Sequence, residues 1–548
     1  MAERRKARSD PFGLIWLLLA VFWLNATLSF QNLWPTPWVR LVPELSAELF
    51  GVLAFLGLLG LVGLQLGRWP LRLMALVWLV ASLLRYAEVT AGPLFGRPLN
   101  IYWDIDHIPN LLDLFWRAAG PLVVILLGLA LLLFLILLFQ LNVAALACVV
   151  RVARGRRALW ISVVGLLGLG AYASIYLPDT ATIRRAFAIP APLIAAKHIG
   201  FAQEVWRLKE AGPAELDALF GPEPGVPSDL LGYAGEDVAI VFLESYGTTL
   251  FDRDSHWPAA EPAFRAMQER LAEAGWHVVS RRLVSPTFGG GSWWAHGSLL
   301  SGARLADQTA YSLYLTTGRE TLVQRFKAAG YRAVAFQPGT QRAWPEGAFF
   351  GFDKVYDAAA LNYEGPDFGY WRIPDQFTLH RVQAAATMSG QPLFAFAVLI
   401  MSHMPFQPQP PYLPDWSRLA DATAYDPEEA AAINAQTPDW SDLSGAYVAA
   451  MGRLHRMLGG WLADQVTRPS LVVLIGDHQP PALVAGEDQP WTVPIHILSK
   501  KPERLAPFLA YGYRPGLFPQ PGSEQPMEKV FEDLLRAGAS RPAAGVAE

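Results

Sequence analysis

The chain has 548 residues, of which 52% are hydrophobic and only 17% are charged, and its mean hydropathy is +0.24. Ordinary soluble domains carry roughly 25% charged residues, so this composition excludes a wholly soluble protein, and its hydrophobic content excludes a disordered one. The net charge of −4 gives no reason to expect a nucleic-acid partner. The single cysteine, Cys148, lies in an apolar run, which excludes an intramolecular disulfide, a cysteine-based zinc site and a cysteine nucleophile in the polar half.

The first 180 residues hold five apolar segments, each approaching the roughly 20 residues that cross a bilayer as a helix. These segments are Phe12–Phe30, Leu49–Leu66, Trp69–Leu84, Pro121–Gln140 and Leu159–Leu177. The sequence therefore predicts an all-α transmembrane domain of five helices over residues 1–180. We do not expect a cleaved signal peptide, because further spans follow the first one.

Basic residues in the short loops predict the orientation of these spans. On one side they are Arg4, Arg5, Lys6, Arg8, Arg68, Arg72, Arg151, Arg154, Arg156 and Arg157. The opposite loops hold fewer, namely Arg40, Arg85, Arg97 and Arg117. Because cytoplasmic loops are enriched in Lys and Arg, we expect a cytoplasmic N-terminus, and five crossings then place everything after Leu177 outside.

Two segments are expected at the outer membrane surface. The loop after the third span carries Arg85, Tyr86 and Glu88 and then Asn100–His107, which includes Asp104–His107. This loop could hold a lipid headgroup or form an interfacial aromatic belt with solvated charges, and both interpretations stay open. Residues 181–235 are predicted to form an interfacial helix and linker, because Arg184–Leu208 mixes cationic with apolar positions and Gly212–Gly235 is rich in Gly and Pro.

From Glu236 onward, short apolar runs alternate with helical patterns. The predicted strands are Val238–Leu243, His277–Val279, Ala333–Phe336, Phe394–Ile400 and Leu471–Ile475, and the predicted helices are Pro262–Ala274, Glu320–Ala329 and Leu443–Val466. The first, fourth and fifth strands are nearly all apolar, which is typical of strands covered on both faces. Residues 236–548 are therefore predicted to form a layered α/β/α domain with a mostly parallel sheet.

Polar residues follow three of these strands. Glu244 follows the first, His403 lies just beyond the fourth, and Asp477 and His478 come soon after the fifth. In such sheets ligands bind beyond the carboxyl ends of the strands. Since Glu, Asp and His are hard or borderline metal ligands, the sequence predicts one Zn²⁺ or Mn²⁺ site at this edge.

A glycine run, Gly289–Gly291, precedes a helix-like segment that begins near Ser292. A hydroxyl at the start of a helix lies among free N–H groups, where phosphate oxygens are stabilised. Ser292 is therefore the candidate nucleophile, activated by metal coordination, and Thr287 is the rival hydroxyl. An ordinary capping serine after a loop is the other interpretation of Ser292.

These features resemble the alkaline phosphatase/sulfatase superfamily, above all its membrane-anchored branch of lipoteichoic acid synthases and phosphoglycerol or phosphoethanolamine transferases. The segments that carry the resemblance most specifically are Gly476-Asp-His478 and Ser402-His-Met-Pro-Phe406. In this branch the nucleophile precedes a Leu-x-Gly segment by about ten positions. Ser292 has that spacing to Gly302, whereas Thr287 does not, although Ser stands where these transferases commonly have Thr.

The resemblance implies an alkaline-phosphatase-like fold and one divalent ion, Mn²⁺ or Zn²⁺ with Mg²⁺ as a further option. Its ligands would be Glu244, Ser292, Asp477 and His478. His403 and Arg342 would contact the phosphate or polar group of the substrate, and His296 is a candidate for proton transfer when the acceptor attacks. His496 either adds a ligand or is a core histidine, since it lies in an apolar run.

Departures from the family narrow the expected activity. True sulfatases have Pro and Arg where this chain has Trp294 and His296, which argues against a formylglycine sulfatase. Phosphoethanolamine transferases of this branch usually carry several disulfides, whereas Cys148 stands alone here, which favours the phosphoglycerol group.

The function implied is a metal-dependent transferase on the outer face of a bacterial cytoplasmic membrane. It would move a phospho-alcohol headgroup, with phosphatidylglycerol favoured as donor, to an envelope glycan or glycolipid through a covalent phospho-serine intermediate. The alternatives are a membrane-anchored phosphodiesterase or phosphatase that uses water, a phosphoethanolamine transferase, and a non-catalytic polysaccharide-binding or assembly subunit.

Overall fold

The computed structural model describes residues 11–540 apart from short stretches. The stretches left out are 34–35, 65, 96–98, 100, 102–107, 109–111, 113–114, 117–118, 177–185, 210–211, 222–224, 341–343, 370, 422–423, 487 and 523. The predictions for Asp104–His107 and for Arg342 therefore lie outside the described residues. The chain divides into two compact units, one running to Glu204 and the other from Val205 onward, and each is described by itself.

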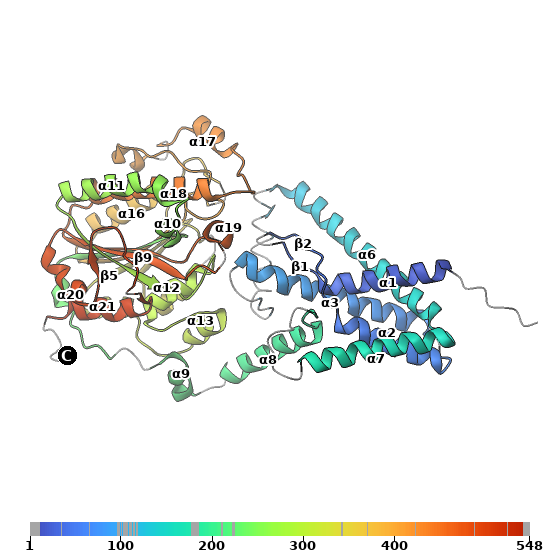
Figure 1. Ribbon diagram of the computed structural model, residues 1–548. Coiled ribbons are helices and arrows are strands. Elements are labelled where there is room, and N and C mark those ends of the chain that lie inside the picture. Colours follow the sequence, from blue (N-terminus) through green and yellow to red (C-terminus); the bar gives the residue numbers. More distant parts are fainter. Residues whose placement is uncertain are drawn as a thin grey trace, which may run out of the picture. The chain divides into compact units, whose positions relative to one another are not determined.

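The first unit is helical (Figure 1). Its helices are α1 (Pro11–Ser29), α2 (Ala47–Leu61), α3 (Arg68–Phe95), α6 (Pro121–Val152) and α7 (Arg156–Tyr176). These helices lie on the five predicted apolar segments. Among the described residues, Arg68–Ala91, Pro121–Val152 and Arg156–Ile175 are long and apolar enough to cross a membrane, whereas α1 and α2 are shorter apolar helices. The helices are confirmed, and the count of five crossings stays a prediction.

Glycines bring two of these helices into close contact. A Cβ atom at Gly57 of α2 would lie 2.4 Å from the hydroxyl oxygen of Ser162, and one at Gly165 of α7 would lie 2.3 Å from the amide nitrogen of Ala54. Small residues at a helix interface allow such an approach in apolar surroundings. In the predicted interfacial and linker region, the structure has the helices α8 (Ala191–Lys209) and α9 (Pro213–Phe220).

The second unit is built on a nine-stranded sheet with the order β10-β4-β9-β8-β3-β7-β5-β6, and β11 pairs with β4. Its strands are β3 (Asp237–Leu243), β4 (His277–Val284), β5 (Arg332–Gln337), β6 (Lys354–Asp357), β7 (Leu393–Leu399), β8 (Ser470–Gly476), β9 (Thr492–Ser499), β10 (Arg514–Pro515) and β11 (Gln525–Pro526). The run from β8 to β6 is parallel, whereas β9 is antiparallel to both β8 and β4. The mostly parallel sheet is confirmed; β6, β9, β10 and β11 were not predicted.

Helices cover both faces of this sheet (Figure 1). One face packs against α11 (Trp257–Glu273), α16 (Asp375–Met388) and α18 (Ser444–Gly460), and the other against α12 (Ser292–Ser301), α14 (Leu322–Ala328) and α21 (Lys529–Gly538). Every residue of β3, β7 and β8 is buried, as expected for strands with a helical layer on each side. The predicted α/β/α layering is confirmed.

Candidate active site

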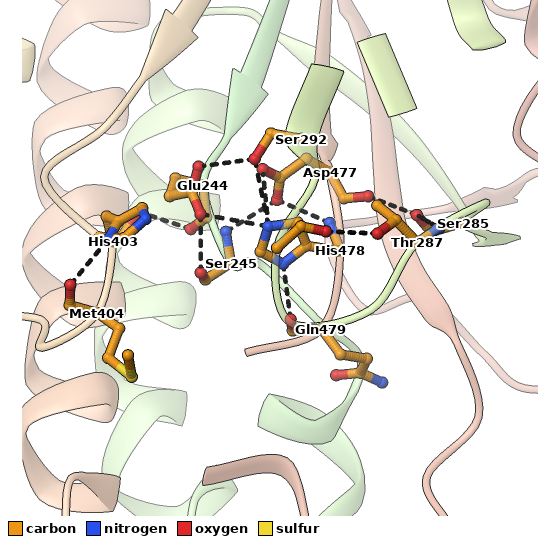
Figure 2. Close-up of polar contacts among 12 residues, drawn as sticks. Glu244, Ser245, Ser285, Thr287, Ser292, His403, Met404, Asp477, His478 and Gln479 are labelled. Carbon is orange, nitrogen blue, oxygen red and sulfur yellow. Dashed lines mark hydrogen bonds and ion pairs between the residues drawn. The ribbon is translucent and has the colours of Figure 1, made fainter. Parts of the chain in front are cut away.

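The site begins where two parallel strands end. Strands β3 and β8 are neighbours, with Leu243 opposite Gly476, so the residues that follow them emerge at the same edge of the sheet. Glu244, Asp477 and His478 are all buried, and their ligand atoms lie within 4.8 Å of one another. Figure 2 shows the three side chains converging on one point. The structure thus brings together the three residues predicted as metal ligands at the strand ends.

The backbone around these residues is held in place by specific contacts. A Cβ atom at Gly476 would lie 2.0 Å from the carbonyl oxygen of Tyr246, so only glycine fits there. Ser245 has a φ of 58°, a conformation that a residue with a side chain rarely adopts outside a constrained site. In this position its amide donates to Asp477 Oδ1 at 2.9 Å and its hydroxyl donates to Glu244 Oε1 at 3.1 Å. Ser245 therefore ties the two strand ends together.

The protonation of His478 follows from its hydrogen bonds. Its Nδ1 lies 2.7 Å from the carbonyl oxygen of Gln479, which can only accept, so Nδ1 carries the proton. The other nitrogen, Nε2, lies 3.4 Å from Glu244 Oε1 and 3.5 Å from Asp477 Oδ2. A ring oriented by a backbone carbonyl in this way presents a lone pair suited to a metal ion.

Ser292 lies at the same point. It is the first residue of α12, and the three glycines before it have φ values of 68°, 151° and 79°. Glycine adopts such angles without a steric penalty, which lets the chain turn tightly into the helix. The Ser292 hydroxyl donates to Glu244 Oε2 at 3.2 Å and lies 3.3 Å from His478 Nε2. The predicted start of the helix is confirmed.

Thr287 lies elsewhere in the loop. Its side chain is buried, its hydroxyl donates to the carbonyl oxygen of Gly290, and its amide donates to the hydroxyl of Ser285. Figure 2 shows it beside Ser285 and away from Glu244. Of the two candidate hydroxyls, Ser292 is therefore the one in contact with the acidic cluster.

The charges of the cluster favour a bound cation. Burial raises the pKa of Asp477 to about 7, and the charge of Glu244 adds to this effect. Burial alone would lower the pKa of His478, but the charges of Asp477 and Glu244 outweigh it and raise that pKa to about 9. Burial likewise works against ionisation of Glu244, yet its hydrogen bond and ion pair with His478 hold its pKa well below the usual range. The carboxylates thus stabilise positive charge at Nε2.

One oxygen of the cluster lacks a hydrogen bond, although it lies 3.5 Å from His478 Nε2. Asp477 Oδ2 is buried and makes no hydrogen bond with any residue that the structure describes. A buried carboxylate oxygen in that state costs free energy unless a cation satisfies it. Two carboxylates, an imidazole lone pair and a hydroxyl form a donor set that fits Zn²⁺ or Mn²⁺. These residues could hold one metal ion.

His403 lies on the Glu244 side of the cluster (Figure 2). Its Nδ1 donates to the carbonyl oxygen of Met404 at 2.7 Å, so Nε2 is the nitrogen left for a substrate. The ring packs against Trp371 with a centroid distance of 4.7 Å. Next to it, the Ser402 hydroxyl donates to the carbonyl oxygen of Glu244 at 2.7 Å. The turn after β7 is thereby joined to the end of β3.

The two other histidines that the sequence analysis named, His296 and His496, are buried in the domain, one among aromatic rings and the other between two hydroxyl groups. His296 packs between Phe242 at 4.4 Å and Phe396 at 5.7 Å, and burial lowers its pKa to about 3. Its role in proton transfer stays a prediction. His496 uses both ring nitrogens, Nε2 with the Tyr246 hydroxyl at 2.8 Å and Nδ1 with the Ser280 hydroxyl at 2.6 Å. His496 is therefore a core histidine, the second of its two interpretations.

Residues 298–500 match the protein-family model described as Sulfatase. The second unit is a sulfatase-family domain. This confirms the resemblance to the sulfatase/alkaline phosphatase superfamily that the sequence suggested. No curated protein matches the chain.

The chain is also similar to solved structures at low identity. The lipoteichoic acid synthase LtaP from Listeria monocytogenes is 15% identical, with 60% of this chain and 78% of that chain covered and a TM-score of 0.37. The Streptococcus pyogenes phosphoglycerol transferase GacH in complex with sn-glycerol-1-phosphate is 13% identical, with 62% and 81% covered and a TM-score of 0.36. The periplasmic domain of the phosphoethanolamine transferase EptC from Campylobacter jejuni is 12% identical, with 55% and 89% covered and a TM-score of 0.34.

The sulfatase-family domain also contains functional neighbours that the sequence did not reveal. Ser245, Ser402 and Asp375 each form hydrogen bonds that position the cluster or the turn at His403. The only sequence signal for Ser245 and Ser402 is that each lies next to a predicted site residue. Asp375 belongs to a separate helix, and nothing in the sequence pattern points to it.

Proposed function

We propose that the protein is a membrane-anchored, metal-dependent phosphotransferase that moves a phosphoglycerol headgroup from phosphatidylglycerol to a glycan or glycolipid of the cell envelope. The observation that carries the proposal is the position of the Ser292 hydroxyl, within 3.2 Å of Glu244 and 3.3 Å of His478 at the start of α12. A hydroxyl in contact with a carboxylate and an imidazole supports a nucleophilic role for Ser292 rather than that of a simple helix cap.

In the first half-reaction, Ser292 Oγ would form a bond to phosphorus while the bond from phosphorus to the diacylglycerol oxygen breaks. The serine proton leaves, and the departing diacylglycerol oxygen gains a proton. The Nδ1 atom of His403 is used by the carbonyl oxygen of Met404, which leaves Nε2 to bind a substrate. His403 is therefore the candidate partner of the phosphate or of the leaving oxygen. In the second half-reaction an acceptor hydroxyl would displace the serine and restore the free enzyme.

Glu244, Asp477 and His478, together with Ser292, would hold one Mn²⁺ or Zn²⁺. When bound, such an ion supplies positive charge beside the phosphoryl oxygens and favours ionisation of a nearby hydroxyl. The buried Asp477 Oδ2, which makes no hydrogen bond with a described residue, supports this assignment. The amide groups at the start of α12 would add dipoles that favour the same phosphate.

Placement at the membrane supports a lipid donor. Among the residues that the structure describes, three helices are long and apolar enough to span a bilayer. The Lys and Arg distribution favours an arrangement in which the sulfatase-family domain lies outside a bacterial cytoplasmic membrane. A domain anchored there meets phospholipid headgroups at high local concentration, which a hydrolase of soluble esters would not need.

The test uses purified full-length protein with mixed phospholipids and Mn²⁺ or Zn²⁺. Mass spectrometry would follow both diacylglycerol release and the intact mass of the protein. We expect diacylglycerol and a covalent adduct on Ser292, and the adduct mass distinguishes phosphoglycerol from phosphoethanolamine. Ser292→Ala should form neither, whereas Thr287→Val, its matched control in the same loop, should retain both.

Two results would change the proposal. Equal release of free glycerophosphate and diacylglycerol without any acceptor would favour the hydrolase. If metal-loaded protein gives no diacylglycerol and no adduct, or if folded Ser292→Ala keeps full turnover, the proposal is wrong.

A further inference from the structure

Asp375 is a buried carboxylate at the start of α16, and its side chain is 3% exposed. Its Oδ1 accepts a hydrogen bond from the amide of Ile400 at 2.7 Å, and its Oδ2 accepts one from the amide of Met401 at 3.0 Å. Hydrogen bonds from backbone amides to a carboxylate are charge-assisted and hold a chain more tightly than neutral ones. Since both oxygens are used, the carboxylate clamps the backbone directly after β7 rather than offering itself to a ligand.

The clamped segment leads straight into the site. The amide of His403 donates to the carbonyl oxygen of Ile400 at 3.0 Å, which closes a turn over residues 400–403. Within this turn, the Ser402 hydroxyl holds the carbonyl of Glu244. Asp375 is therefore connected through two amides to the turn that presents His403.

Packing gives this turn little support on one side. Met401 and Ser402 border a cavity of about 310 Å³, which Asp375 also lines. Well-packed interiors fix side chains by contact on all sides, and a cavity removes those contacts. On the cavity side the turn depends on hydrogen bonds, from Asp375 and from Gln409, whose Nε2 donates to the Met401 carbonyl at 2.5 Å.

We propose that Asp375 is a positioning residue, which fixes the location of His403 relative to Ser292 by clamping the two amides after β7. The role of His403 in catalysis rests on the proposed function; the clamp itself does not. Removing one acceptor oxygen should let the turn relax toward the cavity and misplace His403, while Glu244, Asp477 and His478, which follow β3 and β8, keep their positions.

The chain offers a matched control at the opposite end of the same strand. Asp237 is also buried, and its Oδ1 accepts from the amide of Leu393, the first residue of β7, at 2.8 Å. Both aspartates anchor β7, but only Asp375 does so beside the site. Asp237→Asn therefore measures how much turnover is lost when an aspartate that anchors β7 is removed far from the site.

The experiment compares Asp375→Asn, Asp375→Glu and Asp237→Asn in the full-length metal-loaded protein, alone and combined with His403→Ala. Turnover of phosphatidylglycerol is measured together with amide hydrogen exchange over residues 400–403 and bound metal. We expect Asp375→Asn to lower kcat/KM by about 10- to 100-fold, the usual range for a group that orients a site residue. Asp375→Glu, which keeps the charge but moves the oxygens, should also lose activity, and Asp237→Asn should stay near wild type.

Two further readouts separate positioning from general destabilisation. Exchange at Ile400 and Met401 should speed up in Asp375→Asn with bound metal unchanged. In the His403→Ala background Asp375→Asn should change turnover by no more than about twofold, because coupled residues are not additive.

Wild-type turnover in Asp375→Asn, an equal loss in the His403→Ala background, or unchanged exchange at the two amides would each overturn the inference. A wild-type protein without transferase turnover would instead contradict the proposed function. The exchange measurement would then still decide whether Asp375 holds the turn.

Discussion

Buried acidic residues at the two ends of the central parallel strands have different ion-pair partners. At the amino end, Glu236 pairs with Lys501 and Arg504, each at 2.7 Å, and Asp237 pairs with Arg468 at 3.2 Å. At the carboxyl end, Glu244 and Asp477 form no ion pair with a Lys or Arg among the residues that the structure describes, and face only His478. Both pairs of acids are buried.

This difference separates a structural role from a functional one. Burying a carboxylate costs several kcal/mol unless an opposite charge compensates it. At the amino end the protein supplies that charge itself, as lysine and arginine side chains. At the carboxyl end it supplies only a histidine. The difference lies in this partner and not in hydrogen bonding, because Glu236 Oε2 and Asp237 Oδ2, like Asp477 Oδ2, make no hydrogen bond with a described residue. The carboxyl end therefore has room in its charge balance for a cation that is not part of the chain, which is the metal ion of the proposed function.

The largest effect is expected from Asp477→Asn. The amide oxygen can still accept from Ser245 and His478, but the charge that faces Nε2 is lost. Bound metal and turnover should both fall by more than about 100-fold, beyond the range for groups that only orient ligands. Without metal, the variant should unfold at the same temperature as wild type or higher, because an uncompensated buried carboxylate has gone. Elemental analysis and thermal unfolding with a chelator measure the two effects.

Asp237→Asn is the control for that comparison, since it removes a buried acid from the opposite end of β3, the strand next to β8. It should keep its metal. If Asp477→Asn also kept its metal, the distinction between the two ends would be wrong.

A smaller but still large effect is expected from Gly476→Ala. The added Cβ would meet the Tyr246 carbonyl at 2.0 Å, so the backbone before Asp477 must move. Overpacking of this kind costs about 1–3 kcal/mol of unfolding free energy, and the shift should weaken metal binding as well. Gly390→Ala, at a position with open space, should change neither. Equal stability of the two variants would show that the strand end tolerates displacement.

The site could be predicted from the sequence where chain order alone determines position. Parallel apolar strands end at one edge, so Glu244 and Asp477 were expected together before any geometry was known. The glycine run and the helix that follows likewise located Ser292. The helical unit was predictable in the same sense, because apolar length alone defines its helices.

Other features depend on contacts that no local pattern records. Asp375 reaches Ile400 and Met401 across 25 or more positions of the chain. Strand β9 was missed because Pro494 lies within it, and proline usually argues against a strand interior. The packing of His296, a candidate for proton transfer, against Phe242 and Phe396 is likewise not visible in the sequence.

At the amino end of the strands, Glu236→Gln should affect stability alone. Glutamine keeps the shape but loses two ion pairs, and Lys501 and Arg504 are exposed enough to regain water. We therefore expect a loss of about 1–2 kcal/mol of unfolding free energy, at the lower end for charged hydrogen bonds. Metal content and turnover should match wild type, as measured by elemental analysis and lipid turnover. A loss of metal would mean that the two ends are coupled through β3.

A further effect, confined to acidic conditions, concerns the pH dependence of stability. Burial lowers the pKa of His496 to about 3, and its unfolded value is near 6.5. Below about pH 6.5 His496 is protonated in the unfolded chain, whereas in the folded chain it stays neutral down to about pH 3. The folded state therefore loses stability as the pH falls through this range.

His496→Gln should remove the contribution of this one proton to the slope of unfolding free energy against pH. That contribution is about 1.4 kcal/mol per pH unit between about pH 3 and 6.5. The variant also loses the contacts with Tyr246 and Ser280, which lowers its stability at every pH but does not change the slope. Thermal unfolding from pH 4 to 7, with the exposed His277→Gln as control, measures the slopes. If His496→Gln had the same slope as wild type, His496 would be free to take up a proton in the folded domain, and burial would not hold it neutral.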